Sequence, residues 1–432
     1  MENLVRIRLS PNMTESDLTP IASQRNFFSR KVWPSPYRSN SSSVPFGLRH
    51  LVLCAAAVVL MFSNDESNAV AFQALGVALF ILSGAMFFVT TFDRAVEITP
   101  FDTVMLISVP LSYTAAAFSQ DGYSLMHTTI FLVTYLSAMI IAQRTTAEEL
   151  IMCVRVSTVA ILILVAFVFG HTLISGLMPG QLKRWELREA PFGMHPNLAG
   201  FNYGGFIVMA ANSGMLKWRY NHLLTAVIIG FCLAVMLVAS ARGGLLAVVL
   251  TLAVYVWTEI LRGQRSTFYL IIIGAALVVL SFVFWDTIVA YAVEMLDLES
   301  KQRGLQSGGT GRFEIWARGI DYISGRSWEI FIGSGLRTAG HMGFPVESSY
   351  INLAVESGIF LTAAILISFL SILVRSYRKQ GSASPFHRFA FYTLLFAMFQ
   401  SIFNRYLIAV GNPFSLMILV IASKASARSN PR

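Results

Sequence analysis

One acidic side chain in this sequence has the setting expected of a general base. Glu347 stands in GFPVESSYINLAVESGIF, directly before a long apolar run, and is expected at the boundary between water and lipid. A base that takes a proton from a hydroxyl group must lie within hydrogen-bond reach of it. Glu347 could instead cap the next helix, because carboxylates are stabilised at helix N-termini. His195 or His341 could replace it as the base, and Glu356 could orient an arginine.

Arginines recur in the segments expected on the same side as this acid. Arg242 stands in SARGGLLA, where the following glycines allow a ligand to approach a helix start. Arg312 follows GGTG and opens RFEIWARGIDYI, which has the apolar spacing of an amphipathic helix at a membrane surface. Guanidinium groups bind phosphate through paired hydrogen bonds, although any one of these arginines could be a surface side chain. The further candidates for substrate contact are Arg184, Arg188, His195, Asn197, Arg318, Arg337, His341 and Arg405.

Membrane helices must position these residues. The chain has 432 residues, of which 55% are hydrophobic and 13% charged, which is typical of a polytopic membrane protein. We expect an all-α fold with about 12 transmembrane helices, since each span needs roughly 20 apolar residues. The sixth candidate is weak because it contains Asn197, Asn202, Gly204 and Gly205. The candidate spans are 49–63, 69–91, 101–119, 124–142, 152–175, 196–214, 222–240, 243–261, 267–289, 349–374, 387–403 and 405–423.

The distribution of Lys and Arg predicts the orientation. Two short loops on one side of the predicted spans, NDES (64–67) and QDGY (120–123), contain no basic residue, whereas the tails and every alternate loop carry at least one, so both termini are expected in the cytoplasm. Residues 1–48 then form a disordered cytoplasmic tail, 49–423 the membrane domain and 424–432 a second cytoplasmic tail. The long loop 290–348 faces the periplasm and contains short amphipathic helices. The net charge of +9 follows this topology and does not indicate nucleic-acid binding.

The three cysteines and the histidines do not indicate a metal site or a disulfide. Cys54, Cys153 and Cys232 each fall in or beside a different span, where a cysteine behaves as a small apolar residue. The histidines on the outer side are too dispersed in sequence to predict a metal centre. We therefore expect neither a metal nor a cofactor.

Four local patterns resemble one known family. They are HPNLAGFNYGG (195–205), SARGGLLA (240–247), TGRFEIW with FIGSGL (310–316 and 331–336), and ESSYINLAVESG (347–358). In this order, with a long outer loop, the chain resembles the O-antigen ligase and Wzy polymerase superfamily, especially the ExoQ-type exopolysaccharide polymerases. The resemblance covers about 49–423. One departure is that the ligases of this family have His where this chain has Glu347, which favours a polymerase.

The resemblance implies a reaction and its participants. A glycan on undecaprenyl diphosphate would be transferred to the next lipid-linked repeat unit at the periplasmic face of the bacterial inner membrane, without metal or nucleotide sugar. Arg242 and Arg312 would bind the diphosphate, and Glu347 would be the base. The implied partners are the lipid-linked donor and acceptor, membrane lipids, a chain-length regulator and export proteins.

Two alternative functions remain open at the level of the sequence. One is a ligase that joins finished glycan to a lipid or protein acceptor. The other is a flippase or transporter of lipid-linked sugar. The middles of the predicted spans are almost free of ionisable groups, and no second half resembles the first, which disfavours a transporter.

Overall fold

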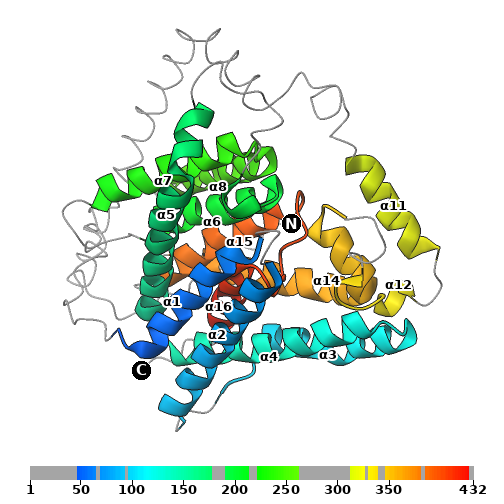
Figure 1. The fold of residues 1–432 in the computed structure, drawn as a ribbon. Coiled ribbons are helices and arrows are strands. Elements are labelled where there is room, and N and C mark those ends of the chain that lie inside the picture. The colour runs from blue at the N-terminus through cyan, green and yellow to red at the C-terminus, as the bar shows by residue number, and fades with distance from the viewer. Residues whose placement is uncertain are drawn as a thin grey trace, which may run out of the picture. The chain divides into compact units, whose positions relative to one another are not determined.

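The computed structural model describes residues 46–64, 69–92, 96–177, 190–213, 221–261, 312–325, 329–338, 346–380 and 385–427. Every regular element in these ranges is helical (Figure 1). Six of these helices are long and apolar enough to cross a membrane. The prediction of an all-α membrane protein is confirmed in this coarse form, while the count of twelve spans stays a prediction.

Helices occupy eleven of the twelve predicted spans, and the remaining one, 267–289, lies outside the described residues. In chain order the eleven are α1 (Leu48–Met61), α2 (Ala69–Thr90), α3 (Pro100–Phe118), α4 (Gly122–Arg144), α5 (Ala147–Leu177), α6 (Pro196–Ser213), α7 (Asn221–Val238), α8 (Arg242–Leu261), α14 (Ser349–Arg378), α15 (Phe386–Gln400) and α16 (Pro413–Ser426). Short 3₁₀ turns, Phe62–Asn64 and Pro191–Gly193, follow α1 and precede α6.

The predicted loop 290–348 contributes two described helices, α11 (Arg312–Ser324) and α12 (Glu329–Ile332), which lie beside α14 (Figure 1). The helix predicted after Arg312 is therefore confirmed. Gly319 faces α14, because a Cβ there would lie 2.8 Å from a methyl of Ile351. Phe313 is exposed, as a membrane-surface helix would have it. Residues 290–311, 326–328 and 339–345 of this loop, and residues 1–45 of the predicted tail, lie outside the described residues.

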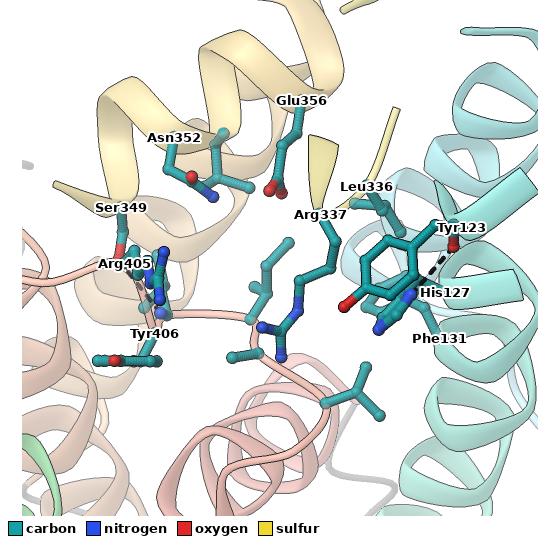
Figure 2. A pocket seen from close by; sticks show the side chains of 15 residues that line it. Tyr123, His127, Phe131, Leu336, Arg337, Ser349, Asn352, Glu356, Arg405 and Tyr406 are labelled. Carbon is teal, nitrogen blue, oxygen red and sulfur yellow. Dashed lines mark hydrogen bonds between the residues drawn. The ribbon is translucent and has the colours of Figure 1, made fainter. Parts of the chain in front are cut away.

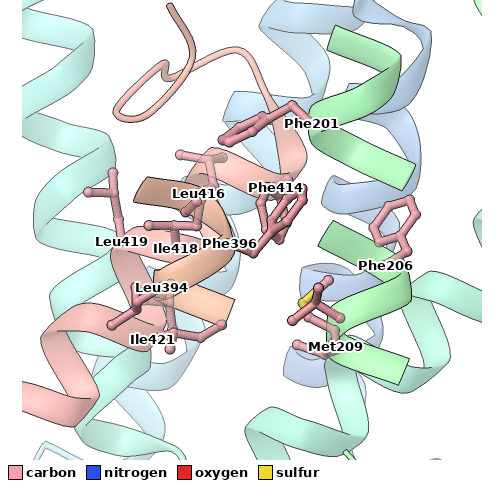
Figure 3. Close-up of a cluster of buried hydrophobic side chains, with 14 of the residues drawn as sticks. Phe201, Phe206, Met209, Leu394, Phe396, Phe414, Leu416, Ile418, Leu419 and Ile421 are labelled. Atoms are coloured by element: carbon pink, nitrogen blue, oxygen red, sulfur yellow. The ribbon is translucent and has the colours of Figure 1, made fainter. Parts of the chain in front are cut away.

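Helix α6, the weakest candidate by hydropathy, is almost entirely buried among other helices. Its polar side chains therefore meet protein and not lipid; Asn412 Nδ2 donates to Asn202 Oδ1 at 3.0 Å. Gly205 lies directly against an aromatic ring, since a Cβ there would be 2.4 Å from Phe414. Figure 3 shows Phe201 beside the same ring, and the two ring centroids are 4.8 Å apart. Burial in a helical core explains why this segment is less apolar than its neighbours.

Helix α14 is interrupted at Gly358, where φ is 74° and ψ is 166°. This conformation is essentially restricted to glycine. A Cβ at Gly358 would lie 2.2 Å from the carbonyl oxygen of Phe331 in α12. Gly333 (φ 75°) makes the reciprocal close approach, with its Cβ position 2.3 Å from the Glu356 carbonyl oxygen. The two glycine-containing motifs of the sequence, FIGSGL and ESG, thus interlock.

Hydrogen bonds secure this interlock. The backbone N–H of Ser334 donates to the Val355 carbonyl, and that of Gly335 to the Glu356 carbonyl, both at 2.9 Å. The break in α14 leaves these carbonyls without their usual intrahelical partners, and the docked segment satisfies them. Arg337 comes shortly after Ser334 and Gly335, and its backbone has a positive φ of 66°. Its side chain belongs to the site described below.

The last predicted span, 405–423, begins too early. Helix α16 starts at Pro413, a residue favoured at the first helical position, and Asn412 caps it by accepting from the Ser415 N–H at 2.9 Å. The apolar residues before Asn412 form irregular backbone instead of helix. Hydropathy alone could not separate them from the helix that follows.

The predicted C-terminal tail, 424–432, also starts too early, because α16 runs to Ser426. Lys424 is part of the helix, and its Nζ donates to the Ala142 carbonyl at the end of α4 at 2.9 Å. Arg144 nearby in sequence donates to the Thr91 carbonyl at 2.5 Å. Segments predicted to be cytoplasmic therefore meet at one set of helix ends. The side of the membrane on which these ends lie stays a prediction.

Candidate functional site

Three segments that are distant in sequence bring Glu347 into a hydrogen-bonded cluster. Asn197, in the first turn of α6, donates from Nδ2 to Glu347 Oε2 at 3.0 Å. Arg312, the first residue of α11, donates from Nε to the same oxygen at 3.4 Å and from Nη2 to Asn197 Oδ1 at 3.2 Å. Gln400 Nε2 lies 3.4 Å from the Asn197 carbonyl, which fixes the helix start. One oxygen of the carboxylate is thus held by both an amide and a guanidinium.

The second carboxylate oxygen of Glu347 is left open. His195 Nε2 lies 3.9 Å from this oxygen, beyond hydrogen-bond distance. Oε1 accepts no hydrogen bond from any residue in the described ranges, and the side chain of Glu347 is 27% exposed. The side chain of His195 is 52% exposed and lies at the solvent-facing edge of this cluster. The arrangement leaves room at Oε1 for a hydroxyl group.

Arg242 opens α8 next to this cluster. The turn before it is tight: Ser240 has a φ of 51°, and its carbonyl accepts from the Arg242 N–H at 2.9 Å. A Cβ at Gly243 would lie 2.8 Å from Phe403, over whose ring the guanidinium of Arg312 sits at 5.5 Å. The helix start that carries Arg242 and the side chain of Arg312 therefore flank the same aromatic ring.

Gly244, the second glycine after Arg242, allows α8 to approach α6 closely. A Cβ at Gly244 would lie 2.5 Å from the Gly200 Cα, so the two helices touch backbone to backbone. Asn197 belongs to the turn of α6 just before Gly200. The GG of the SARGGLLA motif thus sets the distance between the N-terminal ends of α6 and α8.

A cavity of about 260 Å³ adjoins the start of α14 (Figure 2). Its lining residues come from α4, from α14, from the segment that docks on α14 and from the irregular segment before α16. The lining does not include Glu347, although Ser349, two residues later, belongs to it. The lining residues are Tyr123, His127, Phe131, Leu336, Arg337, Ser349, Asn352, Leu353, Glu356, Arg405, Tyr406, Leu407, Ile408, Ala409 and Val410.

Two guanidinium groups and one acid share this cavity. Figure 2 shows Arg337 extending into its middle, with Arg405 on one side and the Glu356 carboxylate on the α14 wall. Glu356 is buried and interacts with the Asn352 side chain and the Arg337 backbone. Within the described ranges, neither guanidinium makes a hydrogen bond or an ion pair at contact distance. Both interact with the Glu356 carboxylate over a longer range, and Arg405 lies 5.9 Å from the ring of Tyr406.

The structure therefore divides the predicted site residues into two neighbouring groups. Glu347, Arg312, Asn197 and His195 form one, with Arg242 beside it, and Arg337 and Arg405 belong to the cavity. The arginines that the sequence analysis expects on one side therefore do not all meet at Glu347 in the described part of the chain. The two groups adjoin because Glu347 stands just before α14, whose first turns line the cavity.

Four other predicted site residues have different outcomes. Arg318 is exposed on α11, and its side chain pairs with Glu314 one turn earlier at 2.5 Å, so the structure gives it no contact with either group. Arg184, Arg188 and His341 lie outside the described residues.

Several cavity residues were not singled out from the sequence. Asn352 and Tyr123 are examples. Asn352 could have been found by helical spacing, because it lies one turn before Glu356 on the same face of α14. Tyr123 carries no such signal, since its place depends on the tertiary packing of α4. Among the described residues, no group of three or more His, Cys, Asp and Glu side chains is placed to hold a metal ion.

No protein-family model matches this chain, and the curated proteins contain no significant match to it. The functional interpretation therefore depends on the residues and their geometry.

Proposed function

We propose that this chain is a membrane glycosyltransferase that polymerises lipid-linked oligosaccharide repeat units into exopolysaccharide or O-antigen at the periplasmic face of the inner membrane. The observation that carries the proposal is the Glu347 carboxylate, with one oxygen anchored by Asn197 and Arg312 and the other open. The order of the sequence motifs, which resembles that of the polymerase and ligase superfamily, supports the same reaction.

Glu347 is the general base in this proposal. An acceptor hydroxyl at Oε1 gives up its proton to the carboxylate as its oxygen forms a bond to the anomeric carbon of the donor sugar. The bond between that carbon and the diphosphate oxygen breaks, and polyprenyl diphosphate leaves with the bonding electrons. Asn197 and Arg312 keep the carboxylate in one orientation, which is the requirement for proton transfer over a hydrogen-bond distance.

Arg242 is suited to the leaving diphosphate. It stands at the N-terminus of α8, where backbone N–H groups and the helix dipole favour an anion. Arg312 adds positive charge nearby, but its hydrogen bonds to Glu347 and Asn197 make it first a positioning residue for the base. Fixed cations near the developing charge lower the barrier without having to reorganise.

The proposal has the donor and acceptor on separate lipids in the same membrane. Both substrates are polyprenyl-diphosphate-linked oligosaccharides, and no metal or cofactor is invoked because the diphosphate already activates the donor. The proposed topology has both termini in the cytoplasm, with a chain-length regulator and export proteins acting on the product.

The test is Glu347→Gln in purified protein supplied with lipid-linked repeat units, with product length read on a gel. Loss of a positioned general base should slow chain growth by roughly 10²- to 10⁴-fold, while the unfolding temperature stays close to that of wild type. Glu347→Asp, which keeps the carboxylate but moves it, should retain part of the activity. Polymer of normal length from the Gln variant would refute the assignment.

The same assay separates the rival functions. Transfer of preformed glycan to a lipid or protein without chain growth would identify a ligase. Movement of the lipid-linked sugar across a bilayer without growth would identify a flippase.

A further inference from the structure

The cavity beside α14 has the charge balance of an anion site. Arg337 and Arg405 supply two positive charges, and Glu356 is the one acid in the lining. Neither guanidinium hydrogen-bonds to a residue in the described part of the chain, although a guanidinium has five N–H donors. Donors that face a cavity without protein partners are satisfied by water or by a ligand. The excess of cations over acids makes an anionic ligand the favourable one.

The backbone of Arg337 is held in an unusual conformation to place its side chain there. Its φ of 66° is uncommon for a residue with a Cβ, and Gly335 two residues earlier has a φ of 102°. Such strain persists only where the surrounding structure enforces it, and it concentrates at ligand sites. Here the interlock with the break at Gly358 enforces it. The structure therefore holds Arg337 in the cavity even without a ligand.

The rest of the lining suits a sugar ring. Tyr123 is 41% exposed, and its ring contacts that of His127 with 4.0 Å between centroids. Tyr406 forms the opposite wall (Figure 2). Tyrosine offers an apolar face and a polar tip, which matches a pyranose ring with its C–H faces and hydroxyl edges. Asn352 adds an amide that can hydrogen-bond with hydroxyl groups.

The size of the cavity limits the ligand. At about 260 Å³ it is slightly smaller than the pockets of roughly 300–1,000 Å³ that enclose drug-sized molecules. One or two monosaccharide units are of this size, whereas a polyprenyl chain is far larger. The occupant is therefore a short piece of glycan or an isolated charged group.

The position of the cavity relates it to the proposed base. From Ser349 to Glu356 the helix rises by about 10 Å, at roughly 1.5 Å per residue. Glu347 stands two residues before Ser349. A glycan with its reacting hydroxyl at Glu347 could thus place a nearby unit of the same chain in the cavity.

We infer that this cavity binds a saccharide unit carrying an anionic group, namely the carboxylate of an acidic sugar in the acceptor glycan, through Arg337 and Arg405. Phosphate is the other oxyanion that such a pair of guanidinium groups could hold. Its source would be the lipid diphosphate. The inference rests on the proposed glycan transfer, but its test does not need turnover.

The experiment is calorimetric titration of the full-length protein in detergent with three probes: a disaccharide containing one glucuronic acid unit, its neutral glucose counterpart, and inorganic pyrophosphate. We expect the acidic disaccharide to bind wild type at least about tenfold more tightly than the neutral one, because a hydrogen bond to a charged group is worth more than a neutral one. Arg337→Gly, which relieves the positive φ, and Arg405→Gln should each weaken binding by about tenfold.

Glu356→Gln gives a change of the opposite sign. It removes the acid that repels the ligand while keeping the shape of the side chain, so the acidic disaccharide should bind more tightly. A damaged fold could not produce this gain. The control is Arg378→Gln at the far end of the same helix, where an exposed arginine is lost with no expected change in affinity.

Equal affinity for the acidic and neutral disaccharides, or weaker binding in Glu356→Gln, would overturn the inference. Pyrophosphate binding that is lost in the two arginine variants, without binding of the acidic sugar, would also overturn it and assign the cavity to the lipid diphosphate. The titrations also separate this inference from the proposed function. If wild type binds the acidic disaccharide but extends no lipid-linked repeat, only the proposed function fails.

Discussion

Replacing Gly358 by Ala tests the interlock that positions Arg337. Gly358 combines a φ of 74° with a ψ of 166° inside α14, and its missing Cβ would lie 2.2 Å from the Phe331 carbonyl oxygen. The added methyl group cannot be accepted by a small side-chain movement, because the nearest atom is backbone. We expect α12 and the segment after it to be displaced from α14.

The magnitude follows from two contributions. An alanine in this region of backbone space costs about 1–3 kcal/mol. Displacement of the docked segment also removes the hydrogen bonds from Ser334 and Gly335 to α14, each worth about 0.5–1.5 kcal/mol net. Together these give a destabilisation of about 2–6 kcal/mol. Arg337 should leave the cavity with the segment that carries it, so the affinity for an anionic saccharide should fall as well.

The assay is thermal unfolding in detergent, followed by the same calorimetric titration below the unfolding temperature. Gly230→Ala in α7 is the matched control, since no atom lies within 4 Å of the added Cβ and an alanine there should stabilise the helix by up to about 1 kcal/mol. A Gly358→Ala protein with the unfolding temperature of wild type and the same affinity for the saccharide would show that the interlock does not hold Arg337 in place.

Two further substitutions separate positioning from stability. Asn197→Ala removes a hydrogen bond to the Glu347 carboxylate that is worth about 1.5–3 kcal/mol. Initial rates of chain growth should therefore fall by roughly 10- to 100-fold, while the affinity for the saccharide stays unchanged. An undiminished rate would contradict the positioning role. Asp102→Asn disturbs a buried carboxylate at the other helix ends that accepts from Tyr135 Oη at 2.6 Å and Ser423 Oγ at 2.8 Å. It should lower the free energy of unfolding by about 1–3 kcal/mol, and a loss of rate per folded molecule would be inconsistent with a structural role.

The positions of the helices were largely predictable because long apolar runs have few other solutions in a membrane. The errors have physical causes. Leu407 and Val410 raised the hydropathy before α16, yet they line the cavity in irregular backbone. Lys424 suggested the start of a tail, yet its side chain reaches the carbonyl groups at the end of α4. Hydropathy records how apolar a segment is, but not what covers it.

The site was predictable in its residue types and less so in its grouping. Glu347 and Arg312 meet directly, and Asn197, which is 150 residues away from the acid in sequence, hydrogen-bonds to the same carboxylate oxygen. Arg337 and Arg405 belong to a separate cavity because α14 breaks at Gly358 and receives the neighbouring segment. Contacts of this kind depend on tertiary packing, which local spacing does not encode.

The polar interior of α6 has a consequence for the making of the protein. Lipid offers no hydrogen-bond donor for the side-chain oxygen of Asn202, and Asn412, 210 residues later in the sequence, supplies one. The ribosome therefore synthesises α6 well before the residue that hydrogen-bonds to Asn202. The order in which these segments are synthesised therefore differs from the order in which their contacts form.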